Sequence, residues 1–86
     1  MEMEERIHEF IREHHVLTLA TVSENTPWVC SCYYTWVKDE RVFVFTSDRE
    51  TRHVRDMEKN PQVAGTVHLE TEVVGKIRGI QFSGEV

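Results

Sequence analysis

The chain has 86 residues, of which 40% are hydrophobic and 29% charged, and its formal net charge is −5 at pH 7. This length predicts one domain over residues 1–86, with the composition of a folded rather than a disordered protein. The negative charge argues against a general nucleic-acid or anionic-membrane surface, which needs many lysines and arginines. No apolar stretch approaches the ~20 residues that span a bilayer, and the acidic start Met1–Glu5 lacks the features of a signal peptide. We therefore expect a cytoplasmic protein without nucleic-acid or membrane partners.

The first half of the chain predicts a short helix followed by three strands. Apolar residues at i, i+3 and i+4 predict an amphipathic helix from Glu4 to about His14. The next runs are rich in β-branched and aromatic residues, which favour strands. The strands expected here are Val16–Ser23, Trp28–Val37 and Val42–Thr46, with a turn at Glu24–Pro27 and a polar connection at Lys38–Arg41.

The second half begins with a helical pattern over residues 47–60. Ser47 and Glu50 have the spacing of a capping box, and Pro61 ends the helix. Glycines in the last predicted strand indicate bulges or close approach of another backbone. This order predicts a mostly β (α+β) fold, an antiparallel barrel with an N-terminal helix and a helix between the third and fourth strands. The two strands expected after the second helix are Gln62–Leu69 and Val73–Val86, the latter with Gly75, Gly79 and Gly84.

The only two cysteines, Cys30 and Cys32, fall two residues apart in a predicted strand. Their side chains point to the same face, but the separation along a strand is too long for an unstrained disulfide. We expect reduced thiols and no metal site, because a lone C-x-C offers fewer ligands than a metal needs. The pair His14 and His15 does not indicate a metal site either, because neighbours on a helix point in different directions.

Hydroxyl and basic side chains gather where the third predicted strand gives way to the second helix. The first turn of a helix offers unpaired N–H groups and a positive dipole end, and an arginine there can make charge-assisted hydrogen bonds. This pattern predicts a cradle for a phosphate-bearing ligand. The alternative is a solvent-exposed helix whose basic residues pair with the acidic residues at 48, 50, 56 and 58. The residues of the cradle are Thr46, Ser47, Thr51, Arg52 and His53, with Arg49 and Arg55 adding positive charge.

Thr46, the triplet Thr51-Arg52-His53 and the run Asn60-Pro61-Gln62-Val63 resemble the strand–helix–strand signature of the FMN-binding split-barrel superfamily, the pyridoxamine phosphate oxidase-like proteins. Within that superfamily, Val63–Val67 and Ile77–Glu85 resemble the uncharacterised YhbP-like branch. The resemblance covers nearly the whole chain and implies an antiparallel split β-barrel. Because domains of the family are longer than this chain, it also implies a barrel that is incomplete at its C-terminal side, either because the chain is truncated or because it is a short variant that its partner completes. It further implies a homodimer.

The resemblance also implies the ligand and its contacts. In such proteins the FMN phosphate is held by the strand-end threonine and the helix-opening triplet. These residues correspond to Thr46 and to Thr51-Arg52-His53 in this sequence, and Ser47 directly follows Thr46. His53 stands where the family commonly has a lysine, and a neutral imidazole is a weaker phosphate partner than an ammonium group. The flavin ring would lie along the second strand, at Cys30, Ser31, Cys32 and Tyr33. Arg78 and Gln81, on the last strand, are further candidates for contact with its polar edge.

The implied function is that of an FMN-dependent oxidoreductase acting on an unidentified small molecule. The flavin itself would carry out hydride or electron transfer. No catalytic residue is assigned, because the sequence has neither a nucleophile–base motif nor a phosphate-binding G-x-x-x-x-G-K. Two other hypotheses stay open. One is a non-catalytic dimeric barrel that has lost flavin or binds another ligand such as haem; the other, opposed by the net charge, is a nucleic-acid binder with stacking aromatic residues.

Overall fold

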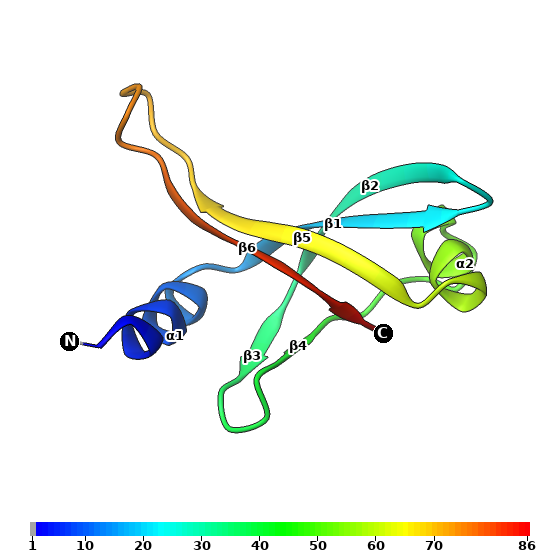
Figure 1. The fold of residues 1–86 in the computed structure, drawn as a ribbon, viewed down its shortest axis with the longest axis horizontal. Helices are drawn as coiled ribbons and strands as arrows, with labels where there is room; N and C mark the ends of the chain where they lie inside the picture. Colours follow the sequence, from blue (N-terminus) through cyan, green and yellow to red (C-terminus); the bar gives the residue numbers. More distant parts are fainter. Residues whose placement is uncertain (1) are drawn as a thin grey trace.

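The protein folds as two antiparallel sheets with a helix at each end of the molecule (Figure 1). The computed structural model describes residues 2–86. Neither helix in this range is long and apolar enough to cross a bilayer. The elements in chain order are α1 (Met3–Glu13), β1 (Val16–Ser23), β2 (Thr26–Tyr33), β3 (Thr35–Val37), β4 (Val42–Val44), α2 (Arg52–Lys59), β5 (Gln62–Leu69) and β6 (Arg78–Glu85).

The larger sheet has the strand order β2-β1-β5-β6. β1 pairs with β2 along its whole length, from Val16 opposite Tyr33 to Ser23 opposite Thr26, and with β5 on its other side. β6 pairs with β5, and β3 and β4 form a separate two-stranded ribbon. All of these pairs are antiparallel, so the predicted mostly β architecture is confirmed, with its N-terminal helix and its second helix before β5.

The single strand predicted over residues 28–37 is two strands, divided at Tyr34. The backbone N–H of Tyr34 donates to the carbonyl of His15, and its hydroxyl donates to the carbonyl of Ile11. The side chain is only 9% exposed. Because these bonds tie Tyr34 to the last turn of α1 and to the connection between α1 and β1, the chain leaves the larger sheet here and continues in the ribbon.

The turn predicted at Glu24–Pro27 is shorter than expected. Glu24 and Asn25 have positive φ angles of 52° and 63°, as in a two-residue hairpin turn. Pro27 therefore lies inside β2, opposite Val22. It is tolerated there because β2 is an edge strand, in which a missing backbone N–H need not cost a ladder hydrogen bond.

Two other predicted strands are shorter in the structure. β4 ends at Val44, two residues before the expected end, and β6 begins at Arg78 rather than at residue 73. Residues 73–76 form a turn, in which the N–H of Lys76 donates to the carbonyl of residue 73. Gly75 has a φ of 89° in this turn, a conformation that glycine adopts at little cost.

The capping box predicted at Ser47 and Glu50 is wrong, because α2 begins only at Arg52, with Thr51 as its N-cap. Asp48 organises the residues before the helix. Its carboxylate accepts a 2.9 Å hydrogen bond from the N–H of Glu50, and its carbonyl accepts bonds from the N–H and hydroxyl of Thr51. A short aspartate side chain competes for local N–H groups in this way and favours a turn over a helix.

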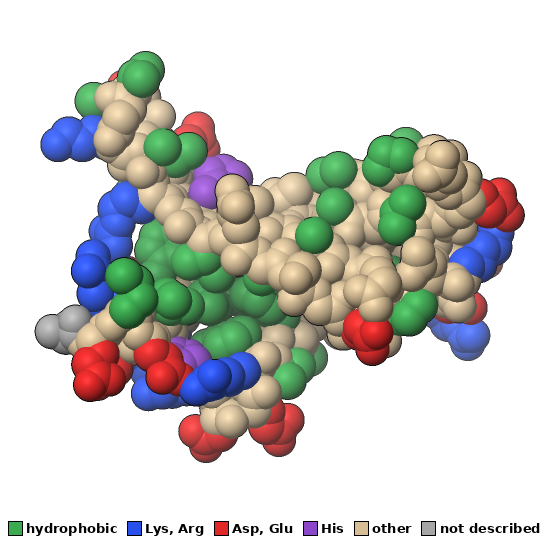
Figure 2. Space-filling view, in the orientation of Figure 1, with side chains coloured by type: hydrophobic (Ala, Val, Ile, Leu, Met, Phe, Trp, Pro, Cys, Tyr) green, Lys and Arg blue, Asp and Glu red, His purple; other side chains and the backbone are tan. Residues whose placement is uncertain are grey.

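The core lies between the larger sheet, the ribbon and α1. Leu17 and Leu19 of β1 and Val67 of β5 are fully buried. The ring of Phe43 lies 4.6 Å from that of Phe82, which joins the ribbon to β6. A hollow of about 720 Å³ opens between α1, the ribbon and β6. Figure 2 shows hydrophobic side chains inside it.

Candidate cofactor site

The predicted cradle residues lie where the β4–α2 loop passes β2. The hydroxyl oxygen of Ser47 is 2.8 Å from Nε2 of His53 and 4.0 Å from Sγ of Cys32. The hydroxyl oxygen of Thr51 is 3.5 Å from the same imidazole nitrogen. Two hydroxyls therefore converge on one nitrogen of His53 at the start of α2, although Ser47 precedes the helix by five residues.

Arg52 is held on one side of this group by two partners. Its guanidinium carbon lies 4.4 Å from the centroid of the Trp28 ring, a cation–π contact with β2. Its Nε is 3.7 Å from Oδ2 of Asp56, one helical turn later. Asp56 is buried, and the same oxygen accepts a 3.1 Å hydrogen bond from the hydroxyl of Thr21 on β1. The Arg52 side chain is 42% exposed, so its guanidinium is oriented yet accessible to a ligand.

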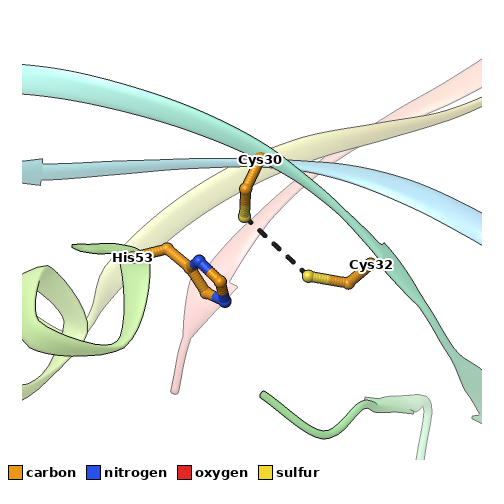
Figure 3. A group of neighbouring side chains, drawn as sticks. All are labelled: Cys30, Cys32 and His53. Atoms are coloured by element: carbon orange, nitrogen blue, oxygen red, sulfur yellow. Dashed lines mark hydrogen bonds between the residues drawn. The ribbon is translucent and has the colours of Figure 1, made fainter. Parts of the chain in front are cut away.

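Cys30 and Cys32 lie on the face of β2 that is turned toward α2 (Figure 3). Both are free thiols, as predicted, with sulfur atoms 3.8 Å apart. Burial raises the pKa of Cys30 to about 11, with smaller contributions from Coulomb repulsion by Cys32 and from the hydrogen bond between the two thiols. Cys30 is therefore protonated at neutral pH.

Ser31 and Tyr33 alternate with the cysteines, and both are exposed. Among residues 2–86, β2 has a strand partner on one edge only, β1. An edge strand presents backbone N–H and C=O groups along its other side, where a planar ligand can reach them. Thr46 is exposed in the loop after β4. The structure thus gathers Cys30, Cys32, Ser47, Thr51 and His53 with Arg52 beside them, and leaves the side chains of Ser31, Tyr33 and Thr46 outside the cluster.

The two further candidates on the last strand lie elsewhere. Arg78 and Gln81 belong to β6, the opposite edge of the larger sheet from β2. The guanidinium of Arg78 lies 5.6 Å from the Phe10 ring of α1. Because β1 and β5 separate β6 from β2, neither residue joins the cluster within one chain.

Sequence reasoning did not select the partners that hold Arg52. Thr21 and Asp56 lie 35 residues apart, and Trp28 was predicted only as the first residue of a strand. One signal was available: an acidic residue at position 56 shares a helical face with His53 and Met57. A carboxylate on a buried helical face requires a partner, because burying it unpaired is costly.

The architecture is that of known split barrels. The structure matches HutZ, described as the haem storage protein of Vibrio cholerae, with a TM-score of 0.82 and 25% sequence identity, over 99% of this chain and 61% of that one. It also matches a conserved hypothetical protein of Mycobacterium tuberculosis with a TM-score of 0.82, over 99% of this chain and 52% of that one. The second pair is 17% identical, so it shows the fold alone.

The chain belongs to the pyridoxamine 5'-phosphate oxidase family, whose model matches residues 3–86. A UPF0306 protein of Photorhabdus laumondii is 42% identical over 80 residues, which are 93% of this chain and 56% of the relative. The chain thus spans about half the length of the curated relatives it matches. These matches confirm the resemblance to the pyridoxamine phosphate oxidase-like proteins and to their YhbP-like branch.

Proposed function

We propose that this chain binds FMN and works as a flavin-dependent oxidoreductase on a small molecule. The phosphate would lie at the start of α2 and the flavin ring along the open edge of β2. The observation that carries the proposal is the convergence of the Ser47 and Thr51 hydroxyls on His53 at a helix N-terminus, which Arg52 opens. The unpaired N–H groups and the dipole of the first helical turn favour an anion there. Membership of the family supports the same ligand.

The donors of this group fit a phosphate. The hydroxyls of Ser47 and Thr51 are engaged within the protein, with His53 and with the carbonyl of Asp48, so phosphate binding exchanges one set of hydrogen bonds for another. Arg52 supplies the charge and can donate two parallel hydrogen bonds. The imidazole of His53 can donate a ring N–H to the phosphate, but it lacks the three N–H donors of a lysine ammonium group.

Bound FMN supplies the hydride or electron transfer, and the chain supplies binding and orientation. Backbone groups of β2 can reach the polar edge of the ring, since one side of this strand carries no partner strand in residues 2–86. Cys30 is protonated at neutral pH because its pKa is about 11, so it would meet the ring as a weak hydrogen-bonding group and not as a nucleophile.

Replacing Arg52 tests the phosphate contact. Arg52→Ala is expected to weaken FMN binding by about 1.5–3 kcal/mol, the contribution of a charged hydrogen bond, or roughly ten- to a hundredfold in Kd. Riboflavin binding should change little, because riboflavin has no phosphate. Both affinities are measured by titration of flavin fluorescence. Arg55→Ala is the matched control, because it removes the same charge from an exposed position of α2. Equal losses for FMN and riboflavin, or equal effects of the two variants, would contradict the contact.

Haem is a second candidate ligand, because HutZ is described as a haem storage protein and shares this fold at 25% identity. On this alternative the chain is a non-catalytic dimeric barrel. The imidazole of His53 and the thiols of Cys30 and Cys32 are side chains of the kinds that bind haem iron. An intense Soret band with added haem, lost in His53→Ala, together with no saturable flavin binding, would favour haem over FMN.

A further inference from the structure

Three side chains of metal-binding type meet between β2 and α2. Cys30 and Cys32 point from the strand toward the helix, and His53 points from the first turn of α2 toward them (Figure 3). One ligand atom from each residue lies within 4.8 Å of the other two. Cys32 is buried and the other two are half-buried, so all three are shielded from bulk water without being sealed from it.

The spacing of the two sulfur atoms matches a tetrahedral metal site. Zinc binds thiolate sulfur at about 2.3 Å, so two sulfurs at a tetrahedral angle around one ion lie ~3.8 Å apart. The observed distance between Sγ of Cys30 and Sγ of Cys32 is 3.8 Å. A zinc-bound imidazole nitrogen would lie ~3.5 Å from each sulfur. In the structure the ligand atoms of all three residues lie within 4.8 Å of one another.

We infer that Cys30, Cys32 and His53 form a binding site for a divalent metal ion that prefers sulfur and nitrogen ligands, with Zn²⁺ as the best-fitting ion. The sequence alone offered only the C-x-C pair, and the fold supplies the third ligand from a residue 21 positions later in the chain. Two thiolates and one imidazole leave a fourth coordination position open to water, as in zinc sites that are not purely structural.

The surroundings suit such an ion. Metal binding would release the two thiol protons, so that the cation faces two thiolates. Repulsion between the two sulfurs is then replaced by attraction of both to the cation. The hydroxyl of Ser47 lies 2.8 Å from His53 Nε2 and 4.0 Å from Cys32 Sγ, so it can hydrogen-bond two of the proposed ligand side chains. Groups in such outer positions orient the ligands and strengthen metal binding.

The inferred metal site does not depend on flavin binding, although the metal ion and the FMN phosphate would both bind His53. A metal ion on the imidazole removes it from the phosphate, so the two forms of the site exclude each other at this residue. Arg52, by contrast, is a proposed ligand of the phosphate and is not one of the three proposed metal ligands. Arg52→Ala therefore separates the proposals: it should weaken FMN binding and leave metal binding unchanged.

The test is a titration of the reduced, flavin-free chain with Co²⁺, followed by displacement with Zn²⁺. We expect one Co²⁺ per chain, with thiolate-to-cobalt charge-transfer absorption and the visible bands of tetrahedral cobalt, all abolished by Zn²⁺. Cys30→Ser, Cys32→Ser and His53→Ala should each weaken Co²⁺ binding at least about tenfold, since even outer partners of metal ligands have effects of this size. His68→Ala, at an exposed position of β5, is the matched control and should bind normally.

Three results would overturn the inference. They are a spectrum without charge-transfer absorption, an unchanged affinity in His53→Ala, or a stoichiometry of one Co²⁺ for two chains. Circular dichroism of the metal-free variants checks that each is folded. Should Cys32→Ser fail to fold because residue 32 is buried, Cys30→Ser and His53→Ala still decide the matter, because both replace half-buried residues.

Discussion

At the residue scale, the two thiols of β2 illustrate how the fold sets the chemistry of its candidate site. Burial is the largest reason why the pKa of Cys30 rises from the ordinary 9.0 to about 11, and Cys32 adds Coulomb repulsion and a hydrogen bond. The thiolate is the reactive form of cysteine. A thiol that keeps its proton at neutral pH is a poor nucleophile, and it has to lose that proton before it can bind a metal ion.

Alkylation of Cys30 in the metal-free protein is expected to be slow at neutral pH and to accelerate as the pH rises through about 11. The alkylation rate rises with pH because only the thiolate reacts. It rises late because the folded state keeps the thiol of Cys30 protonated beyond the pH at which an ordinary thiol ionises. Mass spectrometry after timed iodoacetamide treatment measures the rate at this residue. In Cys32→Ser the profile should move to lower pH, since repulsion and the thiol–thiol hydrogen bond are lost while burial persists. A rate that levels off near pH 9.0, the pKa of an ordinary thiol, would contradict the raised pKa of Cys30.

At the scale of elements, Gly65 of β5 lies in close contact with both of its neighbouring strands, β1 and β6. A Cβ atom at this position would clash with the carbonyl oxygen of Thr18 and lie 2.5 Å from the ring of Phe82. β5 is paired on both sides and cannot move away from one neighbour without disturbing the other. Gly79 has the close approach predicted from the sequence, with a backbone oxygen 2.9 Å from the added atom, whereas Gly84 has nothing within 4 Å.

Gly65→Ala is therefore expected to lower the free energy of unfolding by about 1–3 kcal/mol, as overpacking of a well-packed region does. Urea denaturation measures the change. Gly84→Ala is the control, at a glycine of β6 where an added Cβ meets open space, and should stay within about 0.5 kcal/mol of the parent protein. If the two substitutions lower the free energy of unfolding by the same amount, the close contacts at Gly65 are not the cause of the loss.

The sequence predicted the order of elements and their antiparallel arrangement, because strand runs and turns are local patterns. Element boundaries were wrong where other contacts decided them, as at Tyr34, which is bonded to the end of α1. The same limit applies to the site. Arg52 and His53 could be selected because they open a helix, and Cys30 through the family resemblance, but nothing in the sequence placed Trp28 of β2 against Arg52. Periodicity describes one element at a time and carries no information about which elements meet.

At the scale of the whole molecule, the chain leaves much apolar surface open. The hollow between α1, the ribbon and β6 holds hydrophobic side chains (Figure 2). On β2, Val29 is 60% exposed and Tyr33 is 78% exposed. A domain of this size buries a smaller fraction of its surface than larger domains do and is correspondingly marginal alone. These features favour the predicted homodimer, which is the common way for such surface to be covered.

We expect light scattering coupled to gel filtration to give a mass twice the 10.2 kDa of the chain. The mass should fall toward that of one chain only on strong dilution, because association depends on protein concentration. A mass of 10.2 kDa at every concentration would contradict the dimer. The expected FMN affinities are stated per chain, so they apply to a monomer and to a dimer alike.

The most direct test of the proposed cofactor site compares the affinities of the unmodified chain for FMN and for riboflavin. The two flavins share the ring system, and only FMN carries the phosphate that Ser47, Thr51 and Arg52 would bind. Fluorescence titration is expected to give a Kd for FMN at least about tenfold lower than that for riboflavin, a difference of about 1.4 kcal/mol. Equal affinities, or the absence of saturable binding of either flavin, would contradict a phosphate site at the start of α2.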